Sequence, residues 1–161
     1  MTQNVLIAFY SRSGNTKRIA NLIHNQLGGV LHEIRPVVPY PNSYKATLDQ
    51  AKKEIQAGIR PPLQSKLARM DTYDLIFVGS PNWWSTIAPP VGTFFTTYDF
   101  KGKTIIPFCT HGGGGLGRVE KDIAKLCPKS TLLPGLSIYG SGMGNTRAEV
   151  RAWLAGIGIM N

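Results

Sequence analysis

Short apolar segments alternate along this chain with stretches in which apolar residues recur every three or four positions. The short segments are rich in β-branched residues, which is typical of strands buried on both faces. The stretches between them have the spacing of amphipathic helices. We therefore expect five strands, at 5–10, 30–35, 73–79, 104–109 and 131–139, each followed by a helix.

The expected helices also carry signals at their ends. Pro89 and Pro90 suit the beginning of a helix, and Gly28 suits the end of one. Thr146 and Glu149 have the spacing of a capping box, which predicts that Thr146 caps the last helix. The apolar faces are marked by Ile19, Ile23 and Leu27; by Leu48, Ala51 and Ile55; by Val91, Phe94, Phe95 and Tyr98; by Val119, Ile123 and Leu126; and by Val150, Trp153, Leu154 and Ile157.

This alternation predicts an α/β fold in which a parallel sheet carries helices on both faces. The 161 residues suit one domain, and no linker, low-complexity tract or domain-sized repeat divides them, so we expect a single domain over 1–161. Pro107 and Pro134 fall inside the fourth and fifth strands, where a residue without an N–H is unusual. Ligands of such folds bind beyond the carboxyl ends of the strands, so the loops after strands one, three and four are the places to search.

The loop after the first strand reads Ser11-Arg12-Ser13-Gly14-Asn15-Thr16 and leads directly into a helix. The free N–H groups and the dipole of a helix N-terminus favour a phosphate there, and a glycine lets the backbone approach it closely. One hydroxyl is enough to cap a helix, but this loop has three. We therefore predict a phosphate site, although no Gly-Lys-Ser/Thr of a Walker loop follows.

Two further loops are unusual in composition. Pro81-Asn82-Trp83-Trp84 follows the third strand, and its tryptophans either pack into the core or stack on a planar ring. Thr110-His111 follows the fourth strand and leads into four consecutive glycines, 112–115. Such a run suits a backbone that lies against a ligand, or a flexible connection.

Together these loops resemble those of the flavodoxin-like FMN-binding proteins. The phosphate loop of that family reads Thr/Ser-x-Thr/Ser-Gly-x-Thr, which residues 11–16 match throughout. Its second loop has Pro-x-Trp after strand three, and its third loop is often glycine-rich. The resemblance extends from Val5 to the last helix, and the long segment 36–72 is similar to one subfamily in particular. It implies a flavodoxin-like three-layer sandwich, with a five-stranded parallel sheet of order 2-1-3-4-5.

The resemblance further implies FMN as the cofactor and assigns its contacts. The chain departs from the family at two points. Many flavodoxins have a glycine where Trp84 stands, and many are strongly acidic, whereas this chain is basic. The side chains of Ser11, Ser13, Asn15 and Thr16 would hold the phosphate, with main-chain groups of Arg12 and Gly14; Pro81, Asn82, Trp83 and Trp84 would flank the isoalloxazine ring; and Thr110, His111, Gly112, Gly113 and Gly114 would line its other edge.

The net charge of +9 indicates an anionic partner, substrate or surface, or simply a solubilising face. The function that the resemblance implies is electron transfer between redox proteins, and the charge would suit an acidic partner. The alternative is an FMN-dependent oxidoreductase that uses NAD(P)H and a quinone, since nicotinamide phosphates are anionic. The short chain has no extra segment that would obviously build a substrate pocket, which favours the electron-transfer function over the oxidoreductase. No nucleic-acid-binding motif is present.

Other features exclude several classes of protein. No apolar run approaches the roughly 20 residues of a membrane helix, and no signal peptide precedes the first strand, so we expect a cytoplasmic protein. Cys109 and Cys127 are expected to be free thiols. The histidines are far apart in the sequence, and no spacing predicts a metal site.

Overall fold

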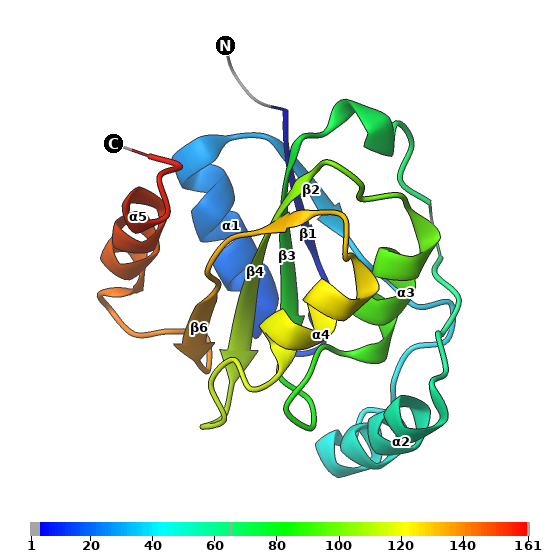
Figure 1. The fold of residues 1–161 in the computed structure, drawn as a ribbon. Coiled ribbons are helices and arrows are strands. Elements are labelled where there is room, and N and C mark those ends of the chain that lie inside the picture. The colour runs from blue at the N-terminus through cyan, green and yellow to red at the C-terminus, as the bar shows by residue number, and fades with distance from the viewer. Residues whose placement is uncertain (1–3, 65, 161) are drawn as a thin grey trace.

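The computed structural model describes residues 4–64 and 66–160, in which an all-parallel sheet lies between two layers of helices (Figure 1). A short 3₁₀ turn, Met70–Thr72, precedes the third strand. In chain order the other elements are β1 (Val5–Phe9), α1 (Asn15–Leu27), β2 (Val30–Glu33), α2 (Tyr44–Ala57), β3 (Leu75–Pro81), α3 (Pro89–Thr97), β4 (Thr104–His111), α4 (Val119–Leu126), β5 (Thr131–Leu132), β6 (Leu136–Tyr139) and α5 (Thr146–Gly156).

The strands are ordered β2-β1-β3-β4-β5, and β6 also pairs with β4. This confirms the expected order 2-1-3-4-5. The register aligns Phe9 with Gly79, and Gly79 with Phe108. A Cβ at Gly79 would lie 2.2 Å from the Phe108 ring, so this position in the centre of the sheet has no room for a side chain.

The expected fifth strand, 131–139, is wrong as one continuous element. It is divided into β5 and β6, and both parts pair with β4. The carbonyls of Ile105 and His111 in β4 accept hydrogen bonds from the N–H groups of Leu133 and Gly140, so alternate residues of β4 face β5 and β6. Pro107 is one of these residues. Because it has no N–H to donate, it faces the interruption between β5 and β6. Gly135 lies in that break, where a Cβ would be 2.8 Å from the Pro107 carbonyl oxygen.

The predicted capping box of α5 is also wrong. Asn145 is the N-cap residue, and no side chain caps the helix there. Thr146 is the first helical residue instead, and its hydroxyl donates to the carbonyl of Met143 at 2.6 Å. A threonine caps a helix by accepting a hydrogen bond from one of its first N–H groups, and it must stand at the N-cap position to do so. That position belongs to Asn145, so the Thr-x-x-Glu motif begins one residue too late.

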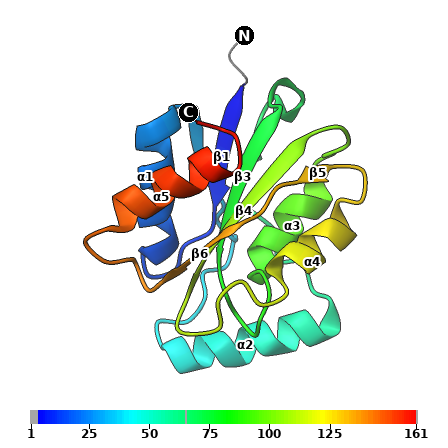
Figure 2. The same ribbon diagram turned by 60° about the vertical axis from the view of Figure 1, so that its left-hand side comes forward.

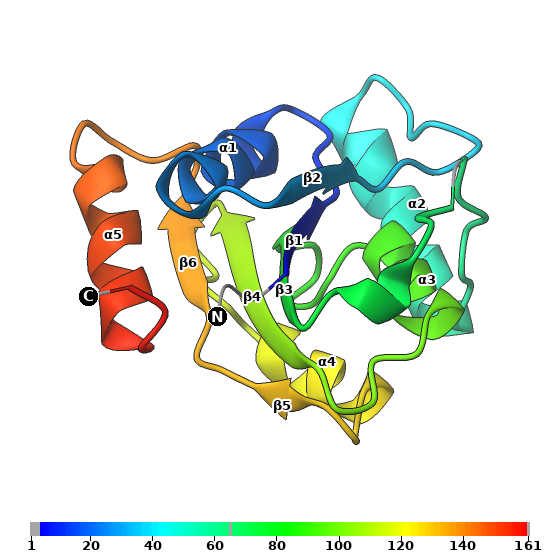
Figure 3. The ribbon, with the colours of Figure 1, turned by 90° about the horizontal axis from the view of Figure 1, so that it is seen from above.

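Apolar residues fill both faces of the sheet. Figure 3 shows α1 and α5 on one face and α3 and α4 on the other. Ile7 and Phe77 are fully buried against the α1–α5 layer, and Leu6 and Ile76 against the opposite layer. Successive residues of each strand thus enter different cores, which is why these strands read as continuous apolar runs. No helix within the described ranges is long and apolar enough to cross a membrane.

The helix α2 does not lie on the sheet as its apolar stripe alone would suggest. Figure 2 shows it crossing beneath the carboxyl ends of the strands, where the loops after β1, β3 and β4 also lie. Its buried residues are Thr47 and Ala51. The Ser43 hydroxyl caps it by accepting from the Ala46 N–H at 3.2 Å. This position brings α2 next to the three loops in which a ligand is expected.

Candidate functional site

The three loops meet at one pocket of about 150 Å³. The strands that precede them are neighbours in the sheet, so their carboxyl ends deliver the loops to one place. Tyr44 of α2 completes the wall. The predicted residues that line the pocket are Arg12, Ser13, Asn15, Thr16, Pro81, Asn82, Trp83, Thr110, His111 and Gly112; Ser11, Gly14, Trp84, Gly113 and Gly114 belong to the same loops but do not line it.

The first loop leaves main-chain donors free at the start of α1. Gly14, at φ 98°, is the left-handed N-cap, and no side chain caps the helix. Its own N–H donates to the Ser11 hydroxyl at 3.0 Å. The first intrahelical bond runs from Arg18 N–H to the Gly14 carbonyl, so the N–H groups of residues 15–17 have no acceptor within the helix. Together with the helix dipole, these donors suit an anion.

Two buried threonines connect the first loop to the third. The hydroxyls of Thr16 and Thr110 lie 2.7 Å apart, and both side chains are buried. One hydroxyl donates to the other, so one of the two hydrogens remains available. Both residues line the pocket, so that hydrogen is available for a ligand there.

The structure gives the two tryptophans different surroundings. Trp83 is only 2% exposed and packs edge-on against Tyr10 and Tyr40, at centroid distances of 5.5 and 5.2 Å. It is a core residue that also borders the pocket. Trp84 is 42% exposed, and its indole N–H donates to the Leu48 carbonyl of α2 at 2.7 Å. Lys52 of α2 lies over its ring, 4.9 Å from the centroid.

Trp84 also occupies an unusual backbone conformation. Its φ is 58° and that of Ser85 is 68°, both in the left-handed region that glycine favours. Many flavodoxins have a glycine at this position. Such strain costs of the order of 1 kcal/mol or more per residue, and the contacts of Trp84 with α2 help to hold this conformation.

The third loop keeps an open side toward the pocket. The Gly113 N–H donates to His111 Nδ1 at 2.9 Å, so the ring hydrogen of neutral His111 is on Nε2. An added Cβ at Gly112 or Gly113 would meet nothing within 4 Å. The Asn82 amide donates to the Gly115 carbonyl at 2.8 Å and so ties the third loop to the second. The open stretch of the loop is therefore Gly112–Gly113.

Arg12 contributes more than the main-chain groups expected of it. Its guanidinium donates to the Thr47 hydroxyl and the Pro41 carbonyl, each at 3.1 Å, and to the Asn42 carbonyl. It also lies 5.7 Å from the centre of the Tyr44 ring. Arg12 thereby attaches the beginning of α2 to the first loop. Sequence reasoning missed Tyr44 and this role of Arg12, because nothing in a helix pattern shows which loop the helix will lie against.

The remaining charges near the site are partly neutralised. Lys17 lies 3.9 Å from Glu33, and Arg118 lies 3.7 Å from Asp122. The Cys109 thiol, just before Thr110, is buried, and burial raises its pKa to about 12. It is therefore a neutral side chain and not an activated nucleophile. Among residues 4–64 and 66–160, no cluster of three or more His, Cys, Asp or Glu side chains is placed to hold a metal ion.

Comparisons with known proteins agree on the family. A family model described as Flavodoxin matches residues 4–157. A structure from Bacteroides eggerthii, classed as a flavoprotein, is 30% identical, with a TM-score of 0.85 over 96% of this chain and 97% of that one. A Lactobacillus acidophilus flavoprotein, solved in complex with FMN, is 22% identical, with a TM-score of 0.76 over 91% and 97%. No curated protein sequence matches significantly.

An established flavodoxin shares the fold at a greater distance. Oxidised flavodoxin 2 from Bacillus cereus is 21% identical, with a TM-score of 0.61 over 96% of each chain. At that identity the likeness concerns the arrangement of strands and helices alone.

Proposed function

We propose that this chain, which belongs to the flavodoxin family, binds one FMN at the candidate site and carries electrons between redox partners. The observation that carries the proposal is the convergence of three loops on one pocket, with free main-chain donors at one end and an open glycine stretch at the other. This arrangement suits a ligand with a phosphate at one end and a planar ring at the other.

The phosphate end of FMN fits the first loop. The N–H groups of Asn15, Thr16 and Lys17 precede the first intrahelical bond, and the hydroxyls of Ser13 and Thr16 lie beside them in the same loop. These neutral N–H and hydroxyl donors can stabilise the phosphate dianion. No lysine has to be desolvated for this. Arg12 adds a positive charge to the lining.

The ring end of FMN fits the pocket only in part. The pocket measures about 150 Å³, which is less than the roughly 300 Å³ or more of cavities that enclose a cofactor-sized ligand. Part of the molecule would therefore extend beyond it, along Gly112 and Gly113, where the space is open. Trp83 and His111 would contact the ring from the two neighbouring loops.

Bound FMN would supply the capacity to accept and release electrons; the protein would supply binding, orientation and charge. Of this chain's residues, His111 presents a ring N–H, and Trp83 presents an apolar edge. An exposed ring edge at the glycine stretch would let a partner approach. The net charge of +9 favours an acidic partner.

The same charge also favours a second candidate, an FMN-dependent oxidoreductase that uses NAD(P)H and a quinone. Anaerobic stopped-flow mixing of the FMN-loaded protein with NADPH separates the two functions. A carrier is reduced by NADPH only slowly and without saturation, but rapidly when a ferredoxin–NADP⁺ reductase is added. Rapid, saturable reduction by NADPH alone would contradict the carrier and support the enzyme.

A further inference from the structure

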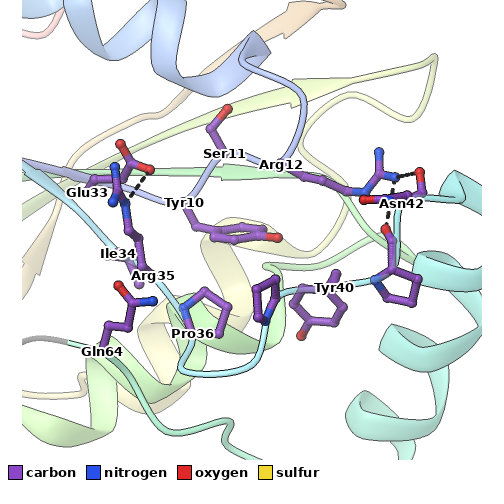
Figure 4. Close-up of a pocket in the computed structure, with 12 residues that line it drawn as sticks. Tyr10, Ser11, Arg12, Glu33, Ile34, Arg35, Pro36, Tyr40, Asn42 and Gln64 are labelled. Carbon is purple, nitrogen blue, oxygen red and sulfur yellow. Dashed lines mark hydrogen bonds and ion pairs between the residues drawn. The ribbon is translucent and has the colours of Figure 1, made fainter.

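A second pocket borders the first loop at Tyr10, Ser11 and Arg12, and Arg12 also lines the candidate FMN pocket. Its volume is about 350 Å³, and it is bounded by the ends of β1 and β2 and by the segment 36–42 (Figure 4). The volume is within the range of small-molecule sites. The flavodoxin-like function uses no residue of this pocket apart from Ser11 and Arg12 of the first loop.

One hydroxyl that borders this pocket has no partner within the described ranges. Tyr10 is 5% exposed, and no hydrogen bond joins its hydroxyl to any residue of the described ranges. In Figure 4 its ring extends between Arg12 and Tyr40, with the hydroxyl directed away from β1. Burial raises the pKa of Tyr10 far above its usual range, so the hydroxyl stays protonated and can donate. Among the described residues, His24 Nδ1 is the one fully buried side-chain polar atom without a partner, so the Tyr10 hydroxyl is not enclosed and opens to the pocket that it borders.

Other donors lie at the same end of the pocket. The Ser11 oxygen accepts from the Gly14 N–H, which leaves the hydrogen of Ser11 free to donate. Arg12 uses its Nε and one terminal nitrogen to bind the beginning of α2, and its other terminal nitrogen remains free, within the described ranges, to donate to a ligand. The charge of Arg35 is neutralised by Glu33 at 2.8 Å, so Arg12 supplies the excess positive charge of the lining. This end of the pocket therefore suits an anion with several acceptor oxygens.

The opposite wall is apolar and rigid. It consists of Ile34, the rings of Pro36, Pro39 and Pro41, and the face of Tyr40. The Tyr40 hydroxyl donates to Glu54 at 2.5 Å, so that it is already satisfied by α2 and Tyr40 offers the pocket its ring. Prolines have fixed φ angles, so this wall is in place before any ligand arrives.

From this pairing of a donor-rich end with an apolar wall, we propose that the pocket binds a small aromatic carboxylate. The carboxylate accepts from the Tyr10 hydroxyl and lies near Arg12, while the ring packs against the wall formed by the prolines and Tyr40. The pocket shares Arg12, and no other lining residue, with the candidate FMN pocket, and the proposal does not depend on FMN binding.

Isothermal titration calorimetry of the protein as purified tests the proposal with benzoate as the probe. We expect saturable binding of one benzoate per chain. Benzamide lacks the charge and cyclohexanecarboxylate lacks the planar ring, so both should bind at least about tenfold more weakly. An isotope-filtered NOE spectrum of the wild-type complex should show contacts from benzoate to the Tyr40 ring.

Tyr10→Phe removes the hydroxyl and keeps the packing, so benzoate should bind at least about tenfold more weakly, as for the loss of a hydrogen bond to a charged group. Tyr73→Phe is the matched control, because Tyr73 lies before β3 at the opposite end of the sheet, and it should bind benzoate as the wild type does. Three results would overturn the proposal: no saturable binding of benzoate, equal binding by Tyr10→Phe, or displacement of FMN by benzoate.

Discussion

The hydroxyl of Thr16, at the start of α1, lies 2.7 Å from the hydroxyl of Thr110, near the end of β4. The two residues are 94 positions apart in the sequence and belong to different predicted loops. Their pairing joins the phosphate end of the candidate site to its ring end. It also leaves one of the two hydroxyl hydrogens for a ligand.

Replacing Thr16 by Ala should therefore weaken FMN binding. The loss of a hydrogen bond to a charged group corresponds to about 1.5–3 kcal/mol, or roughly ten- to a hundredfold in Kd. Riboflavin, which lacks the phosphate, should bind the variant almost as it binds the wild type. Thr16→Ser keeps the hydroxyl and is the control. Equal losses for FMN and riboflavin, measured by quenching of flavin fluorescence, would place Thr16 away from the phosphate.

The two tryptophans should respond differently to mutation, because one is buried and the other is exposed. Trp83→Ala should lower the free energy of unfolding by about 3–5 kcal/mol, as for other large core aromatics. Trp84→Ala should cost no more than about 1–2 kcal/mol, since it removes an exposed hydrogen bond and one cation–π contact. Urea denaturation followed by circular dichroism measures both. A larger loss for Trp84→Ala would contradict their assigned places.

The position of Trp83 also predicts a fluorescence signal. In the double variant Trp84→Phe, Trp153→Phe, Trp83 is the one remaining tryptophan. Added FMN should quench its emission strongly and saturably, because Trp83 lines the pocket. Emission that does not change on FMN binding would place the flavin ring elsewhere.

Much of the fold follows from the sequence because buried parallel strands and amphipathic helices have clear apolar patterns. The strand predicted at 73–79 is β3 at 75–81, and the loop 11–16, which borders the candidate pocket, could be singled out from its three hydroxyls. The break between β5 and β6 could not be predicted, because the sequence does not show which neighbouring strand a proline will face. The position of α2 could not be predicted either. The stripe of Leu48, Ala51 and Ile55 predicts a buried face but not its partner.

Arg12 should control how firmly α2 is held over the site. Its guanidinium binds the Pro41 and Asn42 carbonyls and the Thr47 hydroxyl, which attaches the beginning of α2 to the first loop. Arg12→Gln should therefore increase amide hydrogen exchange across α2, while exchange in β3 and β4 stays as in the wild type. Arg18→Gln, at another surface arginine, is the control. Unchanged protection of α2 would show that other contacts hold it.

Gly112 offers a test of where the ring of FMN lies. A Cβ at this position meets nothing within 4 Å, and its φ is not in the left-handed region, so Gly112→Ala should leave the free energy of unfolding nearly unchanged. It should nevertheless weaken FMN binding, because the methyl group occupies space that the ring needs. Gly156→Ala, at another open position, should have no effect on FMN. Full affinity in Gly112→Ala would move the ring away from the third loop.

The central claim, that one FMN binds this chain, is tested most directly by the visible spectrum of the purified protein together with the mass of the flavin released from it. We predict an oxidised flavin spectrum with two bands, and a released flavin with the mass of FMN at one molecule per chain. Flavin-depleted protein should regain the spectrum on titration with FMN and saturate at one equivalent. A colourless protein that takes up no FMN, or one that releases FAD, would contradict the account.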